Sequence, residues 1–455
     1  MDLVLVLLGV VALIVVATTV LKMHPFLALL LAALLAAFGF RLPLADIPGT
    51  VTGGFGGILG GIGIVIVLGT IIGVILERTG AAVTMAETVI KVLGERFPTL
   101  TISVIGFIVS IPVFCDSGYV ILNSLKESLA RRTGTSMVAM SVALATGLFA
   151  THTLVPPTPG PIAAAGNLGM TDQLGLVILV GLVVAVVAAG VGLLWANRFT
   201  DAEPDGEGAE ELAAATEGLD QLKERYGRLP GPVAALAPIV VPILLICLGS
   251  VANLPAAPFG EGDVAEVLGF VGTPLVALLV GLALAFSLLR AQDGSSRSER
   301  FRDSVADGLT ASAPILLITG AGGAFGAVIA ATDVGTYLGE NLSGLGIGVL
   351  MPFLVAAALK TAQGSSTVAL VTTSALVAPL LSDIGMSSDL GRVLVVMAIG
   401  AGAMTVSHAN DSYFWVVTQF SRMSVAQAYR AQTSATLVMG LSAAVLTWLM
   451  SLVLV

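Results

Sequence analysis

Charge is scarce in this chain of 455 residues. Asp, Glu, Lys and Arg make up only 11% of it, whereas soluble domains carry about 25%. Hydrophobic residues make up 56%, and they recur in uninterrupted stretches of about 20 residues, the length that crosses a bilayer core. A transmembrane β-barrel would instead need alternating apolar and polar residues. The composition therefore predicts an all-α polytopic membrane protein, whose first stretch, residues 3–21, is a retained helix and not a signal peptide.

Cysteine and basic clusters are also scarce, and their scarcity excludes other functions. The two cysteines, Cys115 and Cys247, lie in different apolar stretches and predict neither a disulfide framework nor a metal site. The net charge of −9 and the lack of a basic patch argue against binding to nucleic acid. The glycine run at residues 53–63 lacks the Lys-Ser/Thr ending of a phosphate-binding loop. We therefore expect no cofactor and no pump driven by ATP.

One long polar segment divides the chain near its middle. Residues 199–231 are rich in acidic residues, which is typical of a solvated linker. The parts on either side, residues 1–198 and 232–455, share three elements in the same order, about 260 residues apart. These pairs are GGFGGILGGIG with TGAGGAFGAVI, IPVFCDSGYV with LKTAQGSSTVAL, and THTLVPPTPGP with VSHANDSYFW. The pattern indicates an internal duplication joined by an acidic linker on the cytoplasmic side.

The distribution of Lys and Arg predicts the topology, because these residues favour the cytoplasmic side. Basic residues flank both ends of residues 99–126, so this segment is expected to enter and leave as a re-entrant hairpin. The corresponding hairpin, residues 346–382, enters from outside. Residues 266–289 are expected to cross as one span, and residues 135–170 and 391–420 as spans with a broken helix. Each half then has five spans and one hairpin, an odd count that inverts the second repeat. This arrangement places 17 of the 20 Lys and Arg residues inside, an asymmetry that is lost if each hairpin is a full span.

Polar residues at membrane depth gather at four predicted breaks: the hairpin tips near residues 112–118 and 360–366, and the two broken helices. Charged groups in hydrocarbon are costly, and broken helices are tolerated there only where they are buried or line a cavity. The N-termini of half-helices favour an anion. Lys360 either belongs to this site or extends toward the membrane surface. The candidate site residues are Asp116, Ser117, Gly118, His152, Thr153, Thr158, Gly364, Ser365, Ser366, Thr367, His408, Asn410, Asp411 and Ser412.

Hydroxyl, amide and imidazole groups at these positions suit a small polyhydroxy anion. Less specific interpretations also exist. The prolines between Pro156 and Pro161 would also suit a plain surface loop, and the histidines would also suit structural hydrogen bonds. A second class of function is an intramembrane hydrolase that pairs Ser366 with His408. The chain has no G-x-S-x-G motif, and matched polar clusters in both halves favour alternating access over catalysis, so we expect no enzyme.

The segments IPVFCDSGYVIL, HTLVPPTPGPIAAA, GSSTVALVTT and SHANDSYFW resemble the signature segments of the gluconate permease (GntP) family, within the ion transporter superfamily. The resemblance implies an inner-membrane symporter that imports gluconate or a related sugar acid with protons. It also implies a homodimer, in which scaffold helices hold a transport domain that moves like an elevator. The alternative within this fold is a permease for D-serine, a small hydroxy acid or a dicarboxylate, possibly coupled to sodium. Cys115 replaces an expected larger aromatic residue and Tyr413 an expected glycine, so the sugar acid itself stays open.

Within this hypothesis the predicted residues have different roles. We expect the substrate carboxylate near Ser117 and Gly118 on one tip and near residues 364–367 on the other. We expect Asp116 to be the first candidate for the proton carrier, followed by His152 and Asp411, because histidine titrates near neutral pH and a carboxylate at this depth can be neutralised by a proton. The residues expected to bind substrate hydroxyl groups are Thr153, Thr158, Asn410 and Ser412.

Overall fold

The computed structural model describes residues 20–206, 229–252, 262–290, 295–332, 348–409 and 411–455, with residues 6, 9, 10, 12–14, 16, 17, 226 and 259 and without the side chain of Gln363. Most of the predicted first span, most of the acidic linker and Asn410 therefore lie outside the described residues. The described residues are helical and contain no β-strand.

The described helices of the first half follow one another with short connections. They are α2 (Pro25–Gly39), α3 (Ile47–Arg78), α4 (Ala81–Leu93), α5 (Pro98–Val109), α6 (Cys115–Thr133), α7 (Met137–Leu154), α8 (Pro159–Asn167) and α9 (Leu174–Ala196).

The second half has a similar succession of helices. They are α12 (Pro232–Ala252), α13 (Asp263–Val271), α14 (Pro274–Leu288), α15 (Arg297–Ala330), α17 (Leu350–Gln363), α18 (Ser366–Val377), α19 (Asp389–Met404), α20 (Ser412–Phe420), α21 (Val425–Ala428) and α22 (Ser434–Leu454). One π-helical turn, η5 (Tyr429–Thr433), precedes α22.

Among the described residues, six helical segments are long and apolar enough to cross a membrane, which confirms the predicted polytopic all-α class. Two of them, Met137–Asn167 and Val425–Leu454, include more than one element. A seventh crossing results if α13 and α14 count together. Residues 266–289 were expected to cross as one span; the structure has two helices there, bent by 62° at Gly272 and Thr273. Pro274 begins α14 and disfavours helical backbone at the residue before it, so the helix ends there.

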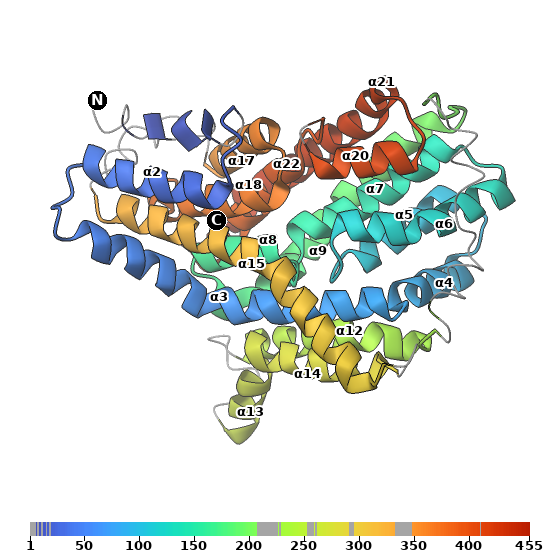
Figure 1. The fold of residues 1–455 in the computed structure, drawn as a ribbon, viewed down its shortest axis with the longest axis horizontal. Helices are drawn as coiled ribbons and strands as arrows, with labels where there is room; N and C mark the ends of the chain where they lie inside the picture. Colours follow the sequence, from blue (N-terminus) through green and yellow to red (C-terminus); the bar gives the residue numbers. More distant parts are fainter. Residues whose placement is uncertain are drawn as a thin grey trace.

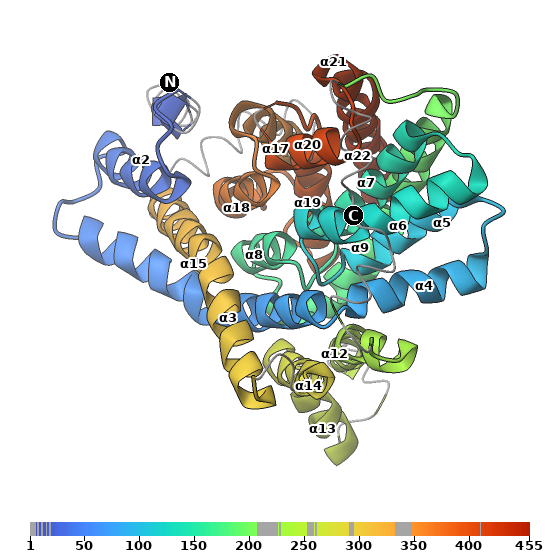
Figure 2. The same ribbon diagram turned by 45° about the vertical axis from the view of Figure 1, so that its right-hand side comes forward.

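Two long helices, α3 and α15, cross each other and form one side of the molecule together with α2 (Figure 1). α12 and α14 pack against the other end of α3 and its neighbour α4 (Figures 1 and 2). The crossing of α3 and α15 is close because small residues meet there: a Cβ on Gly54 would lie 2.6 Å from the carbonyl oxygen of Gly323. Close backbone approach at small residues is how membrane helices gain packing contacts.

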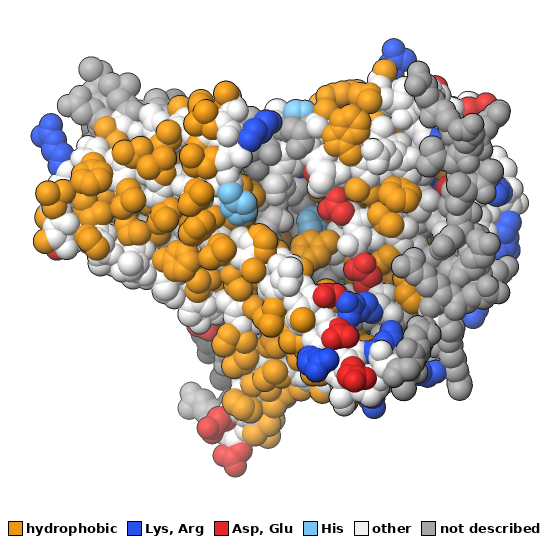
Figure 3. All heavy atoms as spheres, in the orientation of Figure 1, with side chains coloured by type: hydrophobic (Ala, Val, Ile, Leu, Met, Phe, Trp, Pro, Cys, Tyr) orange, Lys and Arg blue, Asp and Glu red, His pale blue; other side chains and the backbone are white. Residues whose placement is uncertain are grey.

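Hydrophobic side chains cover the face that α2, α3 and α15 present, and charged side chains gather near the end of α3 and the start of α15 (Figure 3). At that end Arg78 of α3 pairs with Asp307 of α15. An apolar belt with charges confined to its edge is the surface expected of a membrane span.

Helices α5 to α9 and α17 to α22 form the other group, and their packing repeats between the two halves. α5 packs on α7 as α17 packs on α19, and α7 packs on α9 as α19 packs on α22. α6 contacts α20, and α18 contacts α8. The second arm of each hairpin therefore packs against the second half-helix of the broken helix from the other half of the chain.

Proline sets the first break and a polar cap sets the second. α7 ends before Pro156 and Pro157, and α8 begins at Pro159; proline lacks the N–H donor that a helix needs but fits its first turn. α19 ends at Met404, and α20 begins after Asp411, whose Oδ1 accepts a hydrogen bond of 3.1 Å from the N–H of Tyr413. Both breaks fall inside the residue ranges predicted for them.

The hairpin turns are short. Residues 110–114 separate α5 from α6, so α6 begins at Cys115, inside the expected tip, and extends to Thr133 rather than ending near residue 126. Gly364 ends α17 with φ = 89°, a left-handed conformation that costs glycine little. Ser365 then caps α18, because its Oγ accepts a hydrogen bond of 3.3 Å from the N–H of Val368.

Candidate functional site

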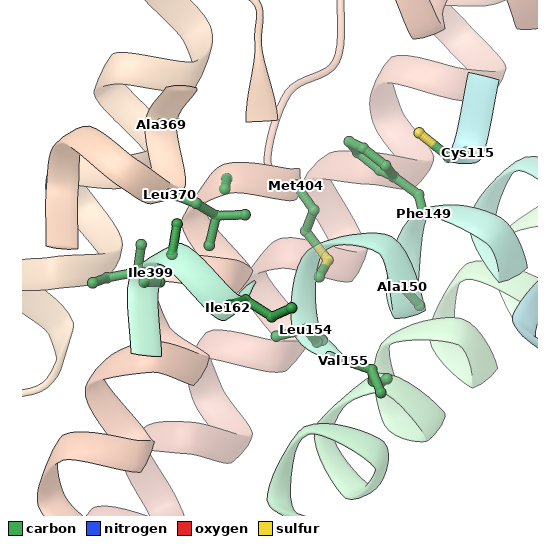
Figure 4. Packing of buried hydrophobic residues seen from close by; sticks show 14 of the residues in the cluster. Cys115, Phe149, Ala150, Leu154, Val155, Ile162, Ala369, Leu370, Ile399 and Met404 are labelled. Carbon is green, nitrogen blue, oxygen red and sulfur yellow. The ribbon is translucent and has the colours of Figure 1, made fainter. Parts of the chain in front are cut away.

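An apolar layer holds the breaks in place. Leu154 and Val155 at the end of α7, Ile162 of α8 and Leu370 of α18 pack with Met404 at the end of α19 (Figure 4). These side chains are buried, so the ends of the half-helices are fixed by the packing of the core. Phe149 of α7 and Cys115 at the start of α6 lie to one side of this layer (Figure 4).

His152 lies in the last turn of α7 and is buried among aromatic rings. The ring of Phe149 stacks on it at 6.4 Å with an interplanar angle of 12°, and the ring of Phe114 lies 5.9 Å away. The side chain is only 6% exposed, and its Nδ1 has no hydrogen-bond partner among the described residues. A buried polar atom without a partner is uncommon, which marks this position as a candidate ligand contact.

Lys360 and Asp411 form a buried ion pair. Lys360 lies in the last turn of α17 and Asp411 at the start of α20, and their Nζ and Oδ2 atoms are 2.6 Å apart. The side chain of Lys360 is fully buried, which contradicts the alternative that it extends to the membrane surface. Its Nζ also donates to the carbonyl oxygen of Gly364 and lies 5.7 Å from the centre of the Phe149 ring. The lysine therefore connects the second hairpin with both broken helices.

Asp411 has further donors around its carboxylate. Ser407 donates to the same Oδ2 at 2.5 Å, and the N–H of Tyr413 donates to Oδ1. The carboxylate is thus held by a cation, a hydroxyl and a helix N-terminus.

Asp116 occupies the first turn of α6, at the more accessible side of the site. Ser412 donates to its Oδ1 at 3.3 Å, and the Sγ of Cys115 lies 3.7 Å from its Oδ2. Ser412 is exposed and Asp116 half-buried. The first hairpin is therefore joined directly to the second broken helix by a polar contact.

The four predicted polar clusters meet in one place. Contacts join the first hairpin to the second broken helix, and the second hairpin to the same broken helix, while the ring of Phe149 links His152 with Lys360. Asp411, Lys360 and His152 form a buried floor, whereas Asp116, Ser412 and Thr361 are more accessible. Figure 3 shows the surface hollowed between the two groups of helices, with histidine side chains in the hollow. The arrangement suits a small anion with hydrogen-bonding groups.

A family model described as GntP family permease matches residues 1–453. The chain belongs to the GntP permease family. A gluconate permease of Pseudomonas aeruginosa is 34% identical over 441 residues, which cover 95% of this chain and 94% of that protein. The inner membrane permease YgbN of Escherichia coli is 31% identical, with 94% of this chain and 93% of that protein covered. The D-serine transporter DsdX of Escherichia coli is 32% identical, with 95% and 94% covered.

The fold is shared with a transporter of known structure. The YdaH transporter of Alcanivorax borkumensis superimposes with a TM-score of 0.68 over 94% of this chain and 98% of that chain, at 16% identity. With the membrane-length helices, family membership makes this GntP permease a multi-pass protein of the inner membrane.

The remaining predicted residues of the permease lie at the breaks but differ in what their groups contact. The hydroxyls of Thr153 and Thr158 donate to backbone carbonyls of their own segments, at 3.1 and 2.7 Å. Gly118 faces the side chain of Leu148, and its N–H donates to Phe114, so it offers no free N–H to a carboxylate. His408 contacts the carbonyl oxygen of Thr361 through Nε2 at 2.8 Å, rather than Ser366 as a hydrolase would require. Ser117 and residues 364–367 lie at or beside the first turns of α6 and α18, and Asn410 lies outside the described residues.

Further residues that the candidate list did not include lie beside the site. Phe149 and Tyr413 pack together, with ring centres 5.1 Å apart, and the Tyr413 hydroxyl donates to the carbonyl oxygen of Ala145 at 2.9 Å. Lys360 had a signal, a cation in an apolar segment, but its partner is 51 residues away. Nothing in the sequence distinguished Phe149 as a residue beside the site, because aromatic residues are common in apolar helices.

Two further observations concern metal ligands and a second cavity. Among the residues that the structure describes, no three His, Cys, Asp or Glu side chains are grouped so that they could hold a metal ion. A cavity of about 400 Å³ lies elsewhere, between α3, α15 and the end of α18. Glycine and alanine dominate its lining, with Asn167 as a polar member. It contains none of the charged groups of the site, so we assign the ligand chemistry to the four breaks.

The turns beside the site rest on α3. A Cβ on Gly73 would lie 2.6 Å from the carbonyl oxygen of Pro112 in the first hairpin turn. A Cβ on Gly69, one turn earlier, would lie 3.0 Å from the carbonyl oxygen of Pro157 in the first break. At these two positions the backbone of α3 therefore packs directly against the carbonyl oxygens of the turns.

Proposed function

We propose that this permease imports gluconate or a related sugar acid by proton symport. The buried Lys360–Asp411 pair supports this function best, because it places a fixed cation and a carboxylate that can take a proton beneath an accessible layer of hydroxyl groups. The gluconate permease among the relatives, which matches nearly the whole chain, supports the substrate class.

The proposed path is an elevator in which α5 to α8 and α17 to α20 move against α3 and α15. The contacts at Gly69 and Gly73 suit sliding, since α3 presents no side chain of its own to the turns at these two positions. The gap beside α15 and α18 leaves room along the same boundary. The moving part would stay together because α6 is bound to the end of α20: Arg422 pairs with the buried Glu127 at 2.9 Å, and Lys126 donates to the carbonyl oxygen of Phe420 at 3.1 Å.

The proposed topology remains two inverted repeats with the linker in the cytoplasm. It is supported by contacts between segments that are distant in sequence, because each joins residues assigned to the same side of the membrane. The cytoplasmic contacts are Arg78 with Asp307, Glu127 with Arg422, and Ser424 with Asp205; the outer contact is Arg392 with Gly169. The family resemblance supports a homodimer.

The test is uptake of labelled gluconate into proteoliposomes with an imposed pH gradient, acidic outside. We expect uptake that rises with the gradient and collapses with a protonophore. Uptake that ignores the gradient or depends strictly on sodium would exclude proton coupling.

D-serine is the second candidate substrate. The relative named as a D-serine transporter is nearly as similar as the gluconate permease, and Cys115 and Tyr413 beside the site leave its shape unlike the expected pattern. A thermal-shift panel of gluconate, other sugar acids, small hydroxy acids, dicarboxylates and D-serine separates the two. Stabilisation by D-serine alone would replace gluconate as the substrate.

A further inference from the structure

The ammonium of Lys360 is the cation within the buried floor of the candidate site. Its contacts are an anion, a carbonyl oxygen and an aromatic ring, all on elements that meet at the breaks. A buried cation without an anion is strongly disfavoured. Asp411 therefore supplies the anion in the structure described, at a position that a bound carboxylate would also favour.

We propose that the substrate carboxylate takes the place of Asp411 on Lys360, and that the displaced Asp411 carries the symported proton. This inference rests on the proposed function, and it assigns the anion-binding and proton-binding groups of that same site.

The charge balance of this exchange would couple the binding of substrate to the binding of a proton. Without substrate, the lysine cation and the Asp411 anion sum to zero. When a monocarboxylate binds Lys360, Asp411 loses its counter-ion and the floor carries one excess negative charge. A proton on Asp411 restores neutrality, so one proton accompanies one monocarboxylate. The loaded floor then has the same net charge as the empty floor, as a domain that moves through a membrane requires.

Several titratable groups surround Asp411. They are Cys115 and Asp116 on α6, His152 on α7, Lys360 on α17, His408 and Tyr413 beside it in its own segment, and Tyr429 on η5. Asp116 itself is more accessible and contacts Ser412 rather than a cation, so the exchange at Lys360 does not remove its counter-ion. His152 has no contact with the pair other than through the Phe149 ring and the field of its charges.

Calorimetry of gluconate binding to the purified permease, in buffers with different ionisation enthalpies at pH 7, counts the protons taken up per ligand. We expect about one for the natural protein and about zero for Asp411→Asn, with binding retained. Asp116→Asn and the exposed control Asp389→Asn should still take up about one. Proton uptake that persists in Asp411→Asn, or disappears in Asp116→Asn, would overturn the assignment.

The role of Lys360 has a separate test that compares gluconate with neutral gluconamide. Losing one charge-assisted contact should weaken gluconate binding about 10- to 100-fold, so Lys360→Met should bind the two ligands almost equally. Lys360→Arg keeps the cation and should retain the preference for gluconate. If Lys360→Met does not elute as a monodisperse protein, the comparison of Lys360→Arg and Lys360→Gln replaces it. A preference for gluconate that survives loss of the cation would overturn the proposal.

These outcomes are distinct from failure of the proposed function. If the natural protein binds none of the sugar acids, the function is wrong. If its uptake of gluconate rises with the pH gradient but Asp411→Asn still takes up a proton on binding, the exchange at Lys360 is wrong and the function stands.

Discussion

Replacement of Gly73 by alanine tests the contact between α3 and the first hairpin. The new Cβ would lie 2.6 Å from the carbonyl oxygen of Pro112. That oxygen belongs to the backbone of a short turn, so it cannot rotate away as a side chain would. α3 and the hairpin would have to separate, and we expect both lower stability and slower transport.

The magnitude follows from two opposing effects. Alanine in place of glycine within a helix is favourable by about 1 kcal/mol, whereas overpacking in a close contact costs about 1–3 kcal/mol. Among the described residues, no atom lies within 4 Å of a new Cβ on Gly61 of the same helix, so Gly61→Ala should show only the favourable effect. The two variants should therefore differ by about 1–3 kcal/mol, and Gly69→Ala, with a distance of 3.0 Å, should fall between them.

The assay combines thermal unfolding in detergent with initial uptake rates in proteoliposomes. We expect the unfolding midpoint to fall in the order Gly61→Ala, Gly69→Ala, Gly73→Ala. If the surface also slides during transport, Gly73→Ala should lower the uptake rate more than it lowers substrate affinity. Equal midpoints and rates for Gly73→Ala and Gly61→Ala would refute the reasoning.

Three other predictions concern the polar contacts. Lys360→Met should destabilise the fold by about 3–5 kcal/mol, because it leaves Asp411 buried without its partner; Lys360→Met/Asp411→Leu should recover much of the unfolding midpoint but no uptake. His152→Gln should keep uptake driven by the pH gradient, because glutamine donates and accepts hydrogen bonds without titrating, and a loss of the gradient dependence alone would assign the proton to His152. Arg422→Met should lower stability by about 3 kcal/mol, since it removes the close cation from buried Glu127, as measured by thermal unfolding.

The control for Arg422→Met is an exposed ion pair. Arg302 lies 3.9 Å from Asp303, and the two side chains are 78% and 57% exposed. Exposed pairs contribute about 0–1 kcal/mol, so Arg302→Met should leave the unfolding midpoint nearly unchanged. Similar losses in both variants would show that burial does not determine the contribution of the Glu127 pair.

A helix break could be predicted from the sequence where a single residue determines the local backbone conformation. Proline lacks an N–H wherever it lies, so the interruption at Pro156 to Pro159 follows from the sequence alone. The bend before Pro274 carried the same kind of signal, but the apolar residues on either side of it suggested one span. The start of α6 at Cys115 was not predictable, because no residue near it forces that boundary and the packing of α6 against α7 and α20 fixes it.

The site was predictable as a set of positions but not as a set of contacts. Because a charged group inside a membrane is energetically costly, Asp116, Lys360 and Asp411 could each be identified from the sequence as a candidate site residue. Which anion pairs with the lysine depends on how the second hairpin packs against the second broken helix, and nothing in the sequence gives that distance. The same limitation applies to His152, because one of its two neighbouring aromatic rings, that of Phe114, lies outside its own helix.

The two halves of the permease repeat their packing but not their charges, and in the proposed function this difference determines on which side of the site an anion would bind. In the first half the hairpin brings an acidic side chain, Asp116, to the breaks, while the second hairpin brings Lys360. The packing of hairpins against broken helices is the same on both sides, so the fold alone does not select the sign of the ligand. The buried cation does: a carboxylate gains a partner next to the second hairpin and meets another carboxylate next to the first.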